Sequence, residues 1–403
     1  MKKSSIIVAA MVVGVLSALF HLPQPYFSSS FYSDIVSVYH DIYPDTDRSR
    51  WYGEPRNYGL PYIDYKFEYP PLIGFLWSIT TYVDRSLSGF GLINYFLNSL
   101  IIVGSFLFLV SDAYSIASLL RSSKWEPLYL IAAPSVIMYL VYNWDVIAIS
   151  LAIRGLKYLL IEGDNIKSGI FIGLSGAAKI IPAVIGLPII VELVRRRSKV
   201  TKDVVKFSSA YILGGAVPFV LLFIITPRGF FSFINHHSSW YLENSWYLMF
   251  TDNLWDPTLR SLSQFIVIAS ILISSLLVLN VPLKERMLVK SWLVTGLFVL
   301  NNYVYTPQMN LMIIPYLSII NPAHPILIFS FDMLNALIMI VWFSEKAWCD
   351  LLGISSRGPW YRESPVQWFS FARCLLLALI LWETISISFI DRGNKGSSSD
   401  DNN

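Results

Sequence analysis

The chain has 403 residues, of which 55% are apolar and 14% are charged. Soluble globular proteins carry about 25% charged residues, so the composition excludes an ordinary soluble domain and indicates an all-α polytopic membrane protein. The formal net charge of +3 is too small to indicate a nucleic-acid partner. Cys349 and Cys374 form neither a CxxC motif nor a metal-site spacing, and we expect inert thiols.

Apolar runs along the chain predict about eleven or twelve membrane spans. Lys2 and Lys3 precede a long apolar core without an A-x-A cleavage pattern, which favours a retained first span over a signal peptide. The run at 167–195 predicts either one kinked helix or a hairpin around Pro182. Residues 1–391 are expected to form a single transmembrane domain, and the polar residues 392–403 a disordered tail. The predicted spans lie near 4–21, 70–84, 90–112, 127–142, 145–160, 167–195, 205–226, 259–280, 287–302, 309–321, 325–344 and 367–391.

Basic residues near the span ends predict which loops face the cytoplasm. The segments 195–202 and 283–290 are the strongest signals of this kind. The loops at 22–69 and 227–258, and the polar segment 301–310, then lie together on the external face. Because successive loops alternate between the two sides of the membrane, the sequence predicts one external site built from these three polar segments. We expect the membrane to be the plasma membrane of a prokaryote, because the chain carries no long regulatory tails.

The first external loop places one carboxylate in a position suited to catalysis. Apolar residues recur at helical spacing through 31–42, which predicts a short juxtamembrane helix with Asp34 on its opposite stripe. A carboxylate held at a membrane mouth beside aromatic rings can have a raised pKa and act as a general base. The alternative is a solvated or helix-capping carboxylate. The Asp-x-Asp pair at 45–47 is neutralised by Arg48 and Arg50, so no divalent metal or other cofactor is expected.

The segment 169–188 holds a single charged residue, Lys179. A lysine inside a span costs about 3 kcal/mol on insertion scales, and such a residue is by default functional. Pro182 breaks the helix and allows a cavity to form there, where a fixed cation suits a phosphate group. The alternative is a lysine that reaches out to the membrane interface. Asp145 keeps two open interpretations, as a helix N-cap or as a site residue.

The second external loop carries two histidines and four large aromatic residues. His236 and His237 are adjacent, so they point in different directions and make a poor metal pair, whereas one of them can donate hydrogen bonds to a phosphate. The aromatic side chains either stack on sugar rings or form an interfacial belt, and the belt is favoured. They are Trp240, Tyr241, Trp246 and Tyr247.

The first loop closes with the stretch "YIDYKFEYPPL" at 62–72, in which charged and aromatic residues alternate. Extended spacing puts the charges on one side and the rings on the other, so the stretch is either a wall of a donor pocket or an interfacial anchor. We assign Lys66 to the donor phosphate. The predicted sugar and acceptor pocket consists of Asp64, Glu68, Tyr69, Asp145, Tyr305 and Gln308.

Several of these motifs occur in a fixed order along the chain. An Asp after the first span is followed by "FEYPPL", by "NWD" before a span, by "GLSGAAKIIP" and by "YTPQ". Together they resemble the C-fold (GT-C) membrane glycosyltransferases, and among these the polyprenyl-phosphate-mannose-dependent alpha-mannosyltransferases of bacteria and archaea, glycosyltransferase family 87. The first mannosyltransferase of GPI-anchor assembly is a more distant relative. The resemblance spans residues 1–320 and departs at 143–145, where that family often has a Gly-Gln pair.

The resemblance implies a GT-C fold with a large first external loop, and transfer of a hexose, mannose in that family, with inversion. The implied donor is a polyprenyl or dolichyl monophosphate sugar, the acceptor is a glycolipid or glycan, and no nucleotide-sugar site is needed. Asp34 is implied as the base, and Lys179 with His236 or His237 as the ligands of the lipid phosphate. Two alternatives stay open: a sugar transporter or lipid flippase, which internal repeats would favour, and a noncatalytic subunit of a glycan assembly complex.

Overall fold

The computed structural model describes residues 3–23, 32–42, 59–120, 126–196 and 200–390. Within these ranges every regular element is a helix, and the β pairing consists of two isolated bridges. The protein is an all-α polytopic membrane protein, as its composition predicts. The predicted tail at 392–403 and the Asp-x-Asp pair at 45–47 lie outside the described residues.

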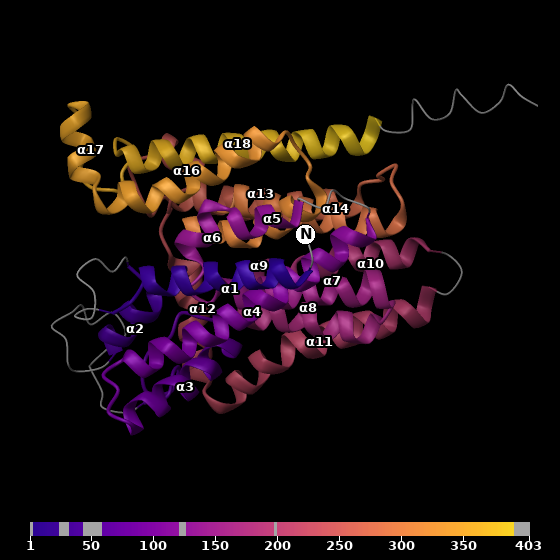
Figure 1. Ribbon diagram of the computed structural model, residues 1–403, viewed down its shortest axis with the longest axis horizontal. Helices are drawn as coiled ribbons and strands as arrows, with labels where there is room; N and C mark the ends of the chain where they lie inside the picture. Colours follow the sequence, from indigo (N-terminus) through magenta and orange to yellow (C-terminus); the bar gives the residue numbers. More distant parts are fainter. Residues whose placement is uncertain (1–2, 24–31, 43–58, 121–125, 197–199, 391–403) are drawn as a thin grey trace, which may run out of the picture.

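Six of the described helices are long and apolar enough to cross a membrane. A helix rises 1.5 Å per residue, so lengths of 18 residues and more give about 27 Å or more, close to the thickness of a hydrocarbon core. In Figure 1, α11, α16 and α18 run along the length of the molecule. The six are α1 (Lys3–Phe20), α4 (Leu92–Leu119), α11 (Val200–Ile225), α13 (Pro257–Leu276), α16 (Pro325–Phe343) and α18 (Pro365–Ile390).

Shorter or interrupted helices pack among these six. Proline ends a helix at the preceding residue because it lacks an N–H and restricts its neighbour, and Pro134 separates two of the short helices in this way. The helix that begins at Asp145 continues into a π-helical turn. These elements are α5 (Glu126–Ala132), α6 (Pro134–Tyr139), α7 (Asp145–Lys157), η1 (Tyr158–Glu162), α8 (Asn165–Ala178), α9 (Ile180–Ala183), α10 (Gly186–Arg195), α14 (Leu283–Asn301), η3 (Pro307–Met312) and α15 (Ile314–Ile320).

The apolar run at 70–84 is not a span, and this prediction is wrong. It forms α3 (Pro71–Ser86), whose 16 residues rise about 24 Å. The helix runs beside the short α2 (Asp34–Ile42) at one end of the molecule (Figure 1). Tyr69, just before α3, donates a hydrogen bond to the first residue of α2, and Asp84, near its other end, accepts one from Tyr39 of α2. Because both ends of α3 meet one short helix, it lies along the molecular end.

The run at 167–195 forms the hairpin that was one of its two predicted outcomes. The helix breaks at Lys179, whose backbone is extended (φ −161°, ψ 133°), three residues before Pro182. From there α10 returns to Arg195, which donates hydrogen bonds to the carbonyls of Leu276 and Leu277 at the end of α13. The hairpin crosses the molecule twice, whereas the sequence counted one span at 167–195. This extra crossing offsets the missing span at 70–84, so the side predicted for each loop after residue 195 is unchanged.

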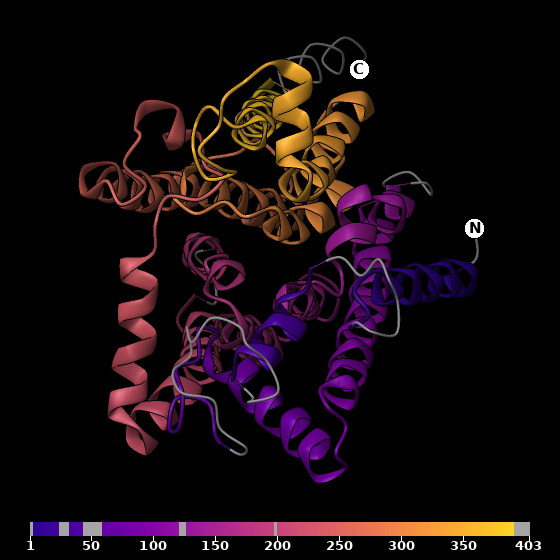
Figure 2. The same ribbon diagram turned by 90° about the vertical axis from the view of Figure 1, so that its left-hand side faces the viewer.

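Short helices gather at the end of the molecule that is at the left of Figure 1. They include α2, α3, α12 (Pro227–Ser239) and α17 (Glu345–Leu352). Figure 2 looks onto this end, and α12 lies across its lower left part. The helix packs tightly on the turn at 60–65, because a Cβ on Gly229 would lie 2.2 Å from the carbonyl oxygen of Tyr62. We call this the pocket end.

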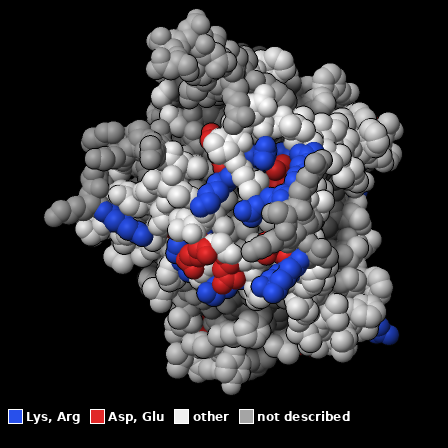
Figure 3. Space-filling model, turned by 90° about the vertical axis from the view of Figure 1, so that its right-hand side faces the viewer, with Lys and Arg blue, Asp and Glu red and all other residues white. Residues whose placement is uncertain are grey.

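Lys and Arg side chains gather on the opposite end of the molecule (Figure 3). In the predicted cytoplasmic segment 283–290, Arg286 and Lys290 both pair with the fully buried Glu192 of α10. Lys290 is itself fully buried and lies 2.6 Å from Glu192. Because a buried charge is tolerated only when it is paired, this contact fixes α10 against α14.

Candidate functional site

A cavity of about 930 Å³ lies among the short helices and loops of the pocket end. The three polar segments that the sequence predicts on one face all contribute to its wall. Most of the lining comes from one side of α2, residues 68–70, 139, 142–143 and 179–181, the C-terminal half of α12 with residues 240, 241, 243 and 244, residues 302–304 and 306–309, and the end of α16 with Trp360. Its size is within the range of small-ligand sites.

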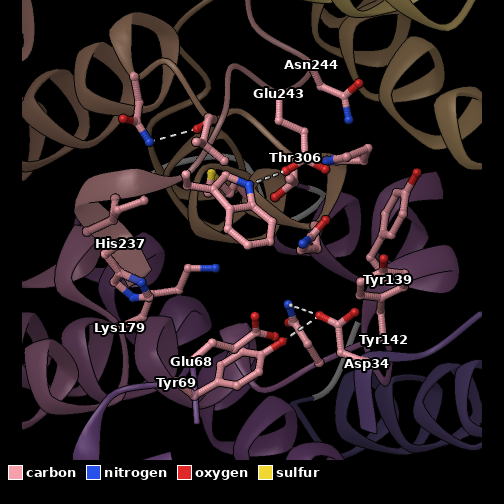
Figure 4. Close-up of a pocket in the computed structure, with 18 of the residues that line it drawn as sticks. Asp34, Glu68, Tyr69, Tyr139, Tyr142, Lys179, His237, Glu243, Asn244 and Thr306 are labelled. Carbon is pink, nitrogen blue, oxygen red and sulfur yellow. Dashed lines mark hydrogen bonds between the residues drawn. The ribbon is translucent and has the colours of Figure 1, made fainter. Parts of the chain in front are cut away.

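Asp34 is the first residue of α2, and its backbone N–H donates to the carbonyl of Tyr142 at 3.0 Å. Its Oδ2 accepts hydrogen bonds from the Tyr69 hydroxyl at 2.6 Å and from Asn143 Nδ2 at 3.4 Å (Figure 4). Burial in the pocket wall, and then the Glu68 carboxylate, raise the pKa of Asp34 to about 7. A carboxyl group that is partly ionised near neutral pH can take a proton from a substrate hydroxyl.

A chain of polar contacts connects Asp34 to Lys179. Asn143, which donates to Asp34, also accepts a hydrogen bond from the N–H of Asp145 at 3.0 Å. Both carboxylate oxygens of Asp145 lie 2.6 Å from Lys179 Nζ. Asp145 is buried, whereas Lys179 is 20% exposed and lines the cavity. The N-cap interpretation of Asp145 is wrong, because Trp144 occupies the cap position and no side chain caps α7.

Close helix packing holds Lys179 in place. The helix α8 that leads to it packs directly on α11, and a Cβ on Gly173 would lie 2.3 Å from the carbonyl oxygen of Tyr211. Small residues allow such an approach of two helix backbones. Lys179 follows in extended conformation, and its ammonium group pairs with the buried carboxylate of Asp145.

Figure 4 places Lys179 and His237 on one side of the cavity and Asp34 on the other. His236, one residue before His237, lies 3.4 Å from Glu68 through its Nε2. His237 is exposed to the cavity. The geometry therefore sets two histidines and a lysine against a carboxyl group across an open space, with Glu68 between them.

The stretch at 62–72 contributes Glu68 and Tyr69 to the cavity wall, but not Asp64 or Lys66. Lys66 is exposed, and Asp64 accepts a hydrogen bond from the N–H of Leu60 at 2.7 Å. Burial alternates along 64–68 as predicted, because Tyr65 and Phe67 are buried and the charged residues between them are more exposed. The turn at 61–65, in which a bridge joins Pro61 to Tyr65, nevertheless keeps Asp64 away from the cavity. The period of two, and with it the common side of the charges, holds only in extended chain.

The third polar segment divides between the cavity and the core. Gln308 lines the cavity. Tyr305 is fully buried behind the wall, where its ring lies 3.6 Å from the guanidinium of Arg373 and its hydroxyl donates to Asn310. The structure therefore brings Gln308 but not Tyr305 to the site.

The four aromatic residues of the second loop also separate. Trp240 and Tyr241 line the cavity, with ring centroids 5.0 Å apart. Trp246 stacks on the fully buried Tyr247 at 4.0 Å, in a hydrophobic cluster against which Trp240 also packs.

Two charged residues of this end were missed by the sequence analysis. Glu243 lines the cavity opposite Asp34 (Figure 4), and its pKa is raised to about 7, by burial and then by Glu68. No local pattern distinguishes it from a solvated loop residue. Arg373 of α18 is fully buried and donates to the carbonyls of Asn244 and Tyr305. The rule that a charge within a span is functional by default applies to it as it does to Lys179.

Metal ligation has no candidate among the described residues, because no group of three or more His, Cys, Asp or Glu side chains there is placed to hold an ion. The expectation that the protein needs no divalent metal stays a prediction.

Comparison with known proteins gives a distant structural likeness. No family model matches the sequence, and no curated protein sequence matches it. The crystal structure of ArnT from Cupriavidus metallidurans bound to undecaprenyl phosphate is similar with a TM-score of 0.49 and 16% identity, over 95% of this chain and 76% of that one. The apo state of the same protein gives a TM-score of 0.43 and 15% identity, over the same shares. Both TM-scores and both identities are low, so the pocket is interpreted from its own residues.

Proposed function

We propose that the protein is an integral-membrane glycosyltransferase. It moves a sugar, mannose by the sequence resemblance, from a polyprenyl or dolichyl monophosphate to a glycolipid or glycan acceptor. The observation that carries the proposal is one cavity in which a carboxyl group with a pKa of about 7, Asp34, faces Lys179 and His237 across an open space. A base and a set of phosphate ligands on opposite walls are what an inverting transfer requires.

The proposed step uses Asp34 as the general base. Asp34 takes the proton of the acceptor hydroxyl while the acceptor oxygen bonds to the anomeric carbon of the donor. The bond between that carbon and the phosphate oxygen breaks, and the lipid phosphate leaves with the electron pair. Attack and departure occur on opposite faces of the sugar, so the anomeric configuration inverts. Tyr69 and Asn143 hold the carboxyl group in place through their hydrogen bonds.

Lys179, His236 and His237 are the proposed ligands of the leaving phosphate. Lys179 supplies a fixed positive charge, oriented by Asp145 at 2.6 Å. The histidines donate from α12 on the same side of the cavity. The Lys179 ammonium group donates a charge-assisted hydrogen bond, which is stronger than a neutral one. Burial lowers the pKa of His237 to about 4, so this histidine donates as a neutral imidazole. Such donors stabilise charge that grows on the phosphate as the bond breaks. Lys66 has no part in this proposal because it does not line the cavity.

The proposed active site faces the outside of the cell, in the plasma membrane of a prokaryote. Lys and Arg side chains gather at the end of the molecule opposite the cavity (Figure 3), and Arg195, Arg286 and Lys290 belong to the predicted cytoplasmic segments 195–202 and 283–290. Basic residues next to spans remain in the cytoplasm, which supports an external position for the pocket end.

The test is a transfer assay in proteoliposomes with labelled polyprenyl-phosphate mannose as donor and a glycolipid extract as acceptor. We expect transfer by the wild type, and a loss of about 10²- to 10⁴-fold in kcat for Asp34→Asn, the usual contribution of a general base. The control Asp350→Asn changes an exposed aspartate of α17 that pairs with Lys346, and we expect it to leave kcat unchanged.

Two results contradict the proposal. Full transfer activity of Asp34→Asn would show that Asp34 is not the general base. Movement of labelled lipid across the bilayer without sugar transfer identifies a flippase instead, and neither transfer nor movement is the result expected of a noncatalytic subunit.

A further inference from the structure

A second part of the cavity wall is built around Trp240 and Glu243, immediately after α12. The indole Nε1 of Trp240 donates a hydrogen bond to Glu243 Oε2 at 2.9 Å. The Trp240 ring centroid lies 4.8 Å from that of His236. All three residues line the cavity. An aromatic face and a carboxyl group are thus joined next to the proposed phosphate ligands.

The backbone of Glu243 is fixed on both sides. Its N–H donates to the carbonyl of Tyr303 at 3.0 Å, and its carbonyl accepts from the N–H of Tyr305 at 2.8 Å. The following Asn244 has a left-handed backbone (φ 48°), and its carbonyl accepts from the buried Arg373 at 2.8 Å. Such a residue is uncommon in this region and needs surrounding contacts to hold it. The Glu243 carboxyl group is therefore preorganised by the protein.

One oxygen of Glu243 remains available to a ligand. Oε2 accepts from Trp240, whereas no described residue donates a hydrogen bond to Oε1. The carboxyl group is half-buried at the cavity wall, so Oε1 is open to a donor that enters the cavity. A ligand hydroxyl can donate to it.

Resting on the proposed transferase function, we propose that Trp240 and Glu243 form the subsite for the donor sugar ring. The Trp240 ring packs on the apolar face of the sugar, and Glu243 Oε1 accepts a hydrogen bond from a ring hydroxyl. The sugar is bonded directly to the phosphate, so its ring must lie beside the residues that hold the phosphate, and Trp240 contacts one of these, His236. Glu243 acts here as a specificity-determining residue, distinct from the base Asp34.

The experiment measures binding of polyprenyl-phosphate mannose and of analogues that each have one ring hydroxyl replaced by hydrogen. A hydrogen bond to a charged group predicts that the wild type binds one analogue about 10- to 100-fold more weakly than the full donor. In Glu243→Ala we expect the Kd values for the full donor and for that analogue to differ by about twofold or less. In Glu243→Gln we expect a factor between those of Glu243→Ala and the wild type, because the amide oxygen still accepts a hydrogen bond.

Two further variants support the comparison. Trp240→Phe keeps a ring but removes the donor to Glu243 Oε2, and we expect it to reduce the discrimination without abolishing it. Glu363→Gln is the matched control, because Glu363 pairs with Arg357 away from the cavity wall, and we expect wild-type Kd values for every analogue. If Glu243→Ala does not fold, as a melting curve reports, Glu243→Gln carries the comparison.

The outcomes separate this inference from the function on which it rests. Wild-type discrimination in Glu243→Gln and Glu243→Ala overturns the subsite, while transfer of mannose by the wild type leaves the proposed function standing. Equal binding of all analogues by the wild type also overturns the subsite. Binding of the donor with hydroxyl discrimination that depends on Glu243, but without transfer, supports the subsite and overturns the transferase. Absence of any donor binding overturns both.

Discussion

Removing the Tyr69 hydroxyl tests whether Asp34 is the base, because the change should shift the pH dependence of the transfer reaction. The hydroxyl donates to Asp34 Oδ2 at 2.6 Å and so stabilises the ionised carboxylate, which counteracts the burial that raises the pKa of Asp34 to about 7. Tyr69→Phe keeps the ring, which packs on Trp144 with centroids 4.6 Å apart. The variant therefore removes one hydrogen bond and leaves the packing of the pocket wall in place.

The size of the effect follows from that hydrogen bond. A hydrogen bond to a charged group contributes about 1.5–3 kcal/mol, and we take about 1.5 kcal/mol because Asp34 is only half-buried. This amount corresponds to about one pKa unit, so the pKa of Asp34 rises to about 8. The base must be ionised to act, and at pH 7 its ionised fraction falls from about one half to about one tenth. We expect kcat/KM to fall about fivefold at pH 7 and to recover above about pH 9.

The assay is the pH profile of kcat/KM for transfer by wild type, Tyr69→Phe and the control Tyr82→Phe. Tyr82 is an exposed residue of α3, and its variant should follow the wild-type profile. The expected result is an acid limb whose midpoint moves to higher pH in Tyr69→Phe alone. An equal loss of activity at every pH, with an unmoved midpoint, refutes the assignment of Asp34 as the titrating base.

Two further predictions concern the support of the site. Lys179→Met leaves the buried Asp145 without its partner, and we expect a loss of about 3 kcal/mol in the free energy of unfolding. The double variant Lys179→Met, Asp145→Asn should regain most of that stability, as melting curves in detergent report, but it should not regain the affinity for the donor. Equal melting temperatures of the single and the double variant contradict the pairing of Lys179 with Asp145. Gly229→Ala places a Cβ 2.2 Å from the Tyr62 carbonyl oxygen, and we expect about 1–3 kcal/mol of destabilisation together with a higher donor KM. In the control Gly104→Ala the new methyl meets nothing within 4 Å, and stability should rise slightly.

Local sequence patterns predicted much of the fold and part of the site. Apolar runs marked the crossing helices, because the free energy of moving a segment into a bilayer depends mainly on its own composition. The lone charge at Lys179 indicated a special position for the same reason. The short helix that begins at Asp34 followed from its apolar spacing. Each of these inferences uses residues within a few turns of one another.

The composition by itself determined the class of protein, and the polar loops indicated the regions of chain that line the cavity. The tertiary structure decided that 70–84 lies along the pocket end as α3, because the hydropathy of a run does not record what its two ends contact. It also joined Asn143 to Asp34 and Lys179 to Asp145, and it placed Glu243 across the cavity from Asp34. These pairs are separated by up to about two hundred residues of chain, and packing of the helices between them sets which side chains meet.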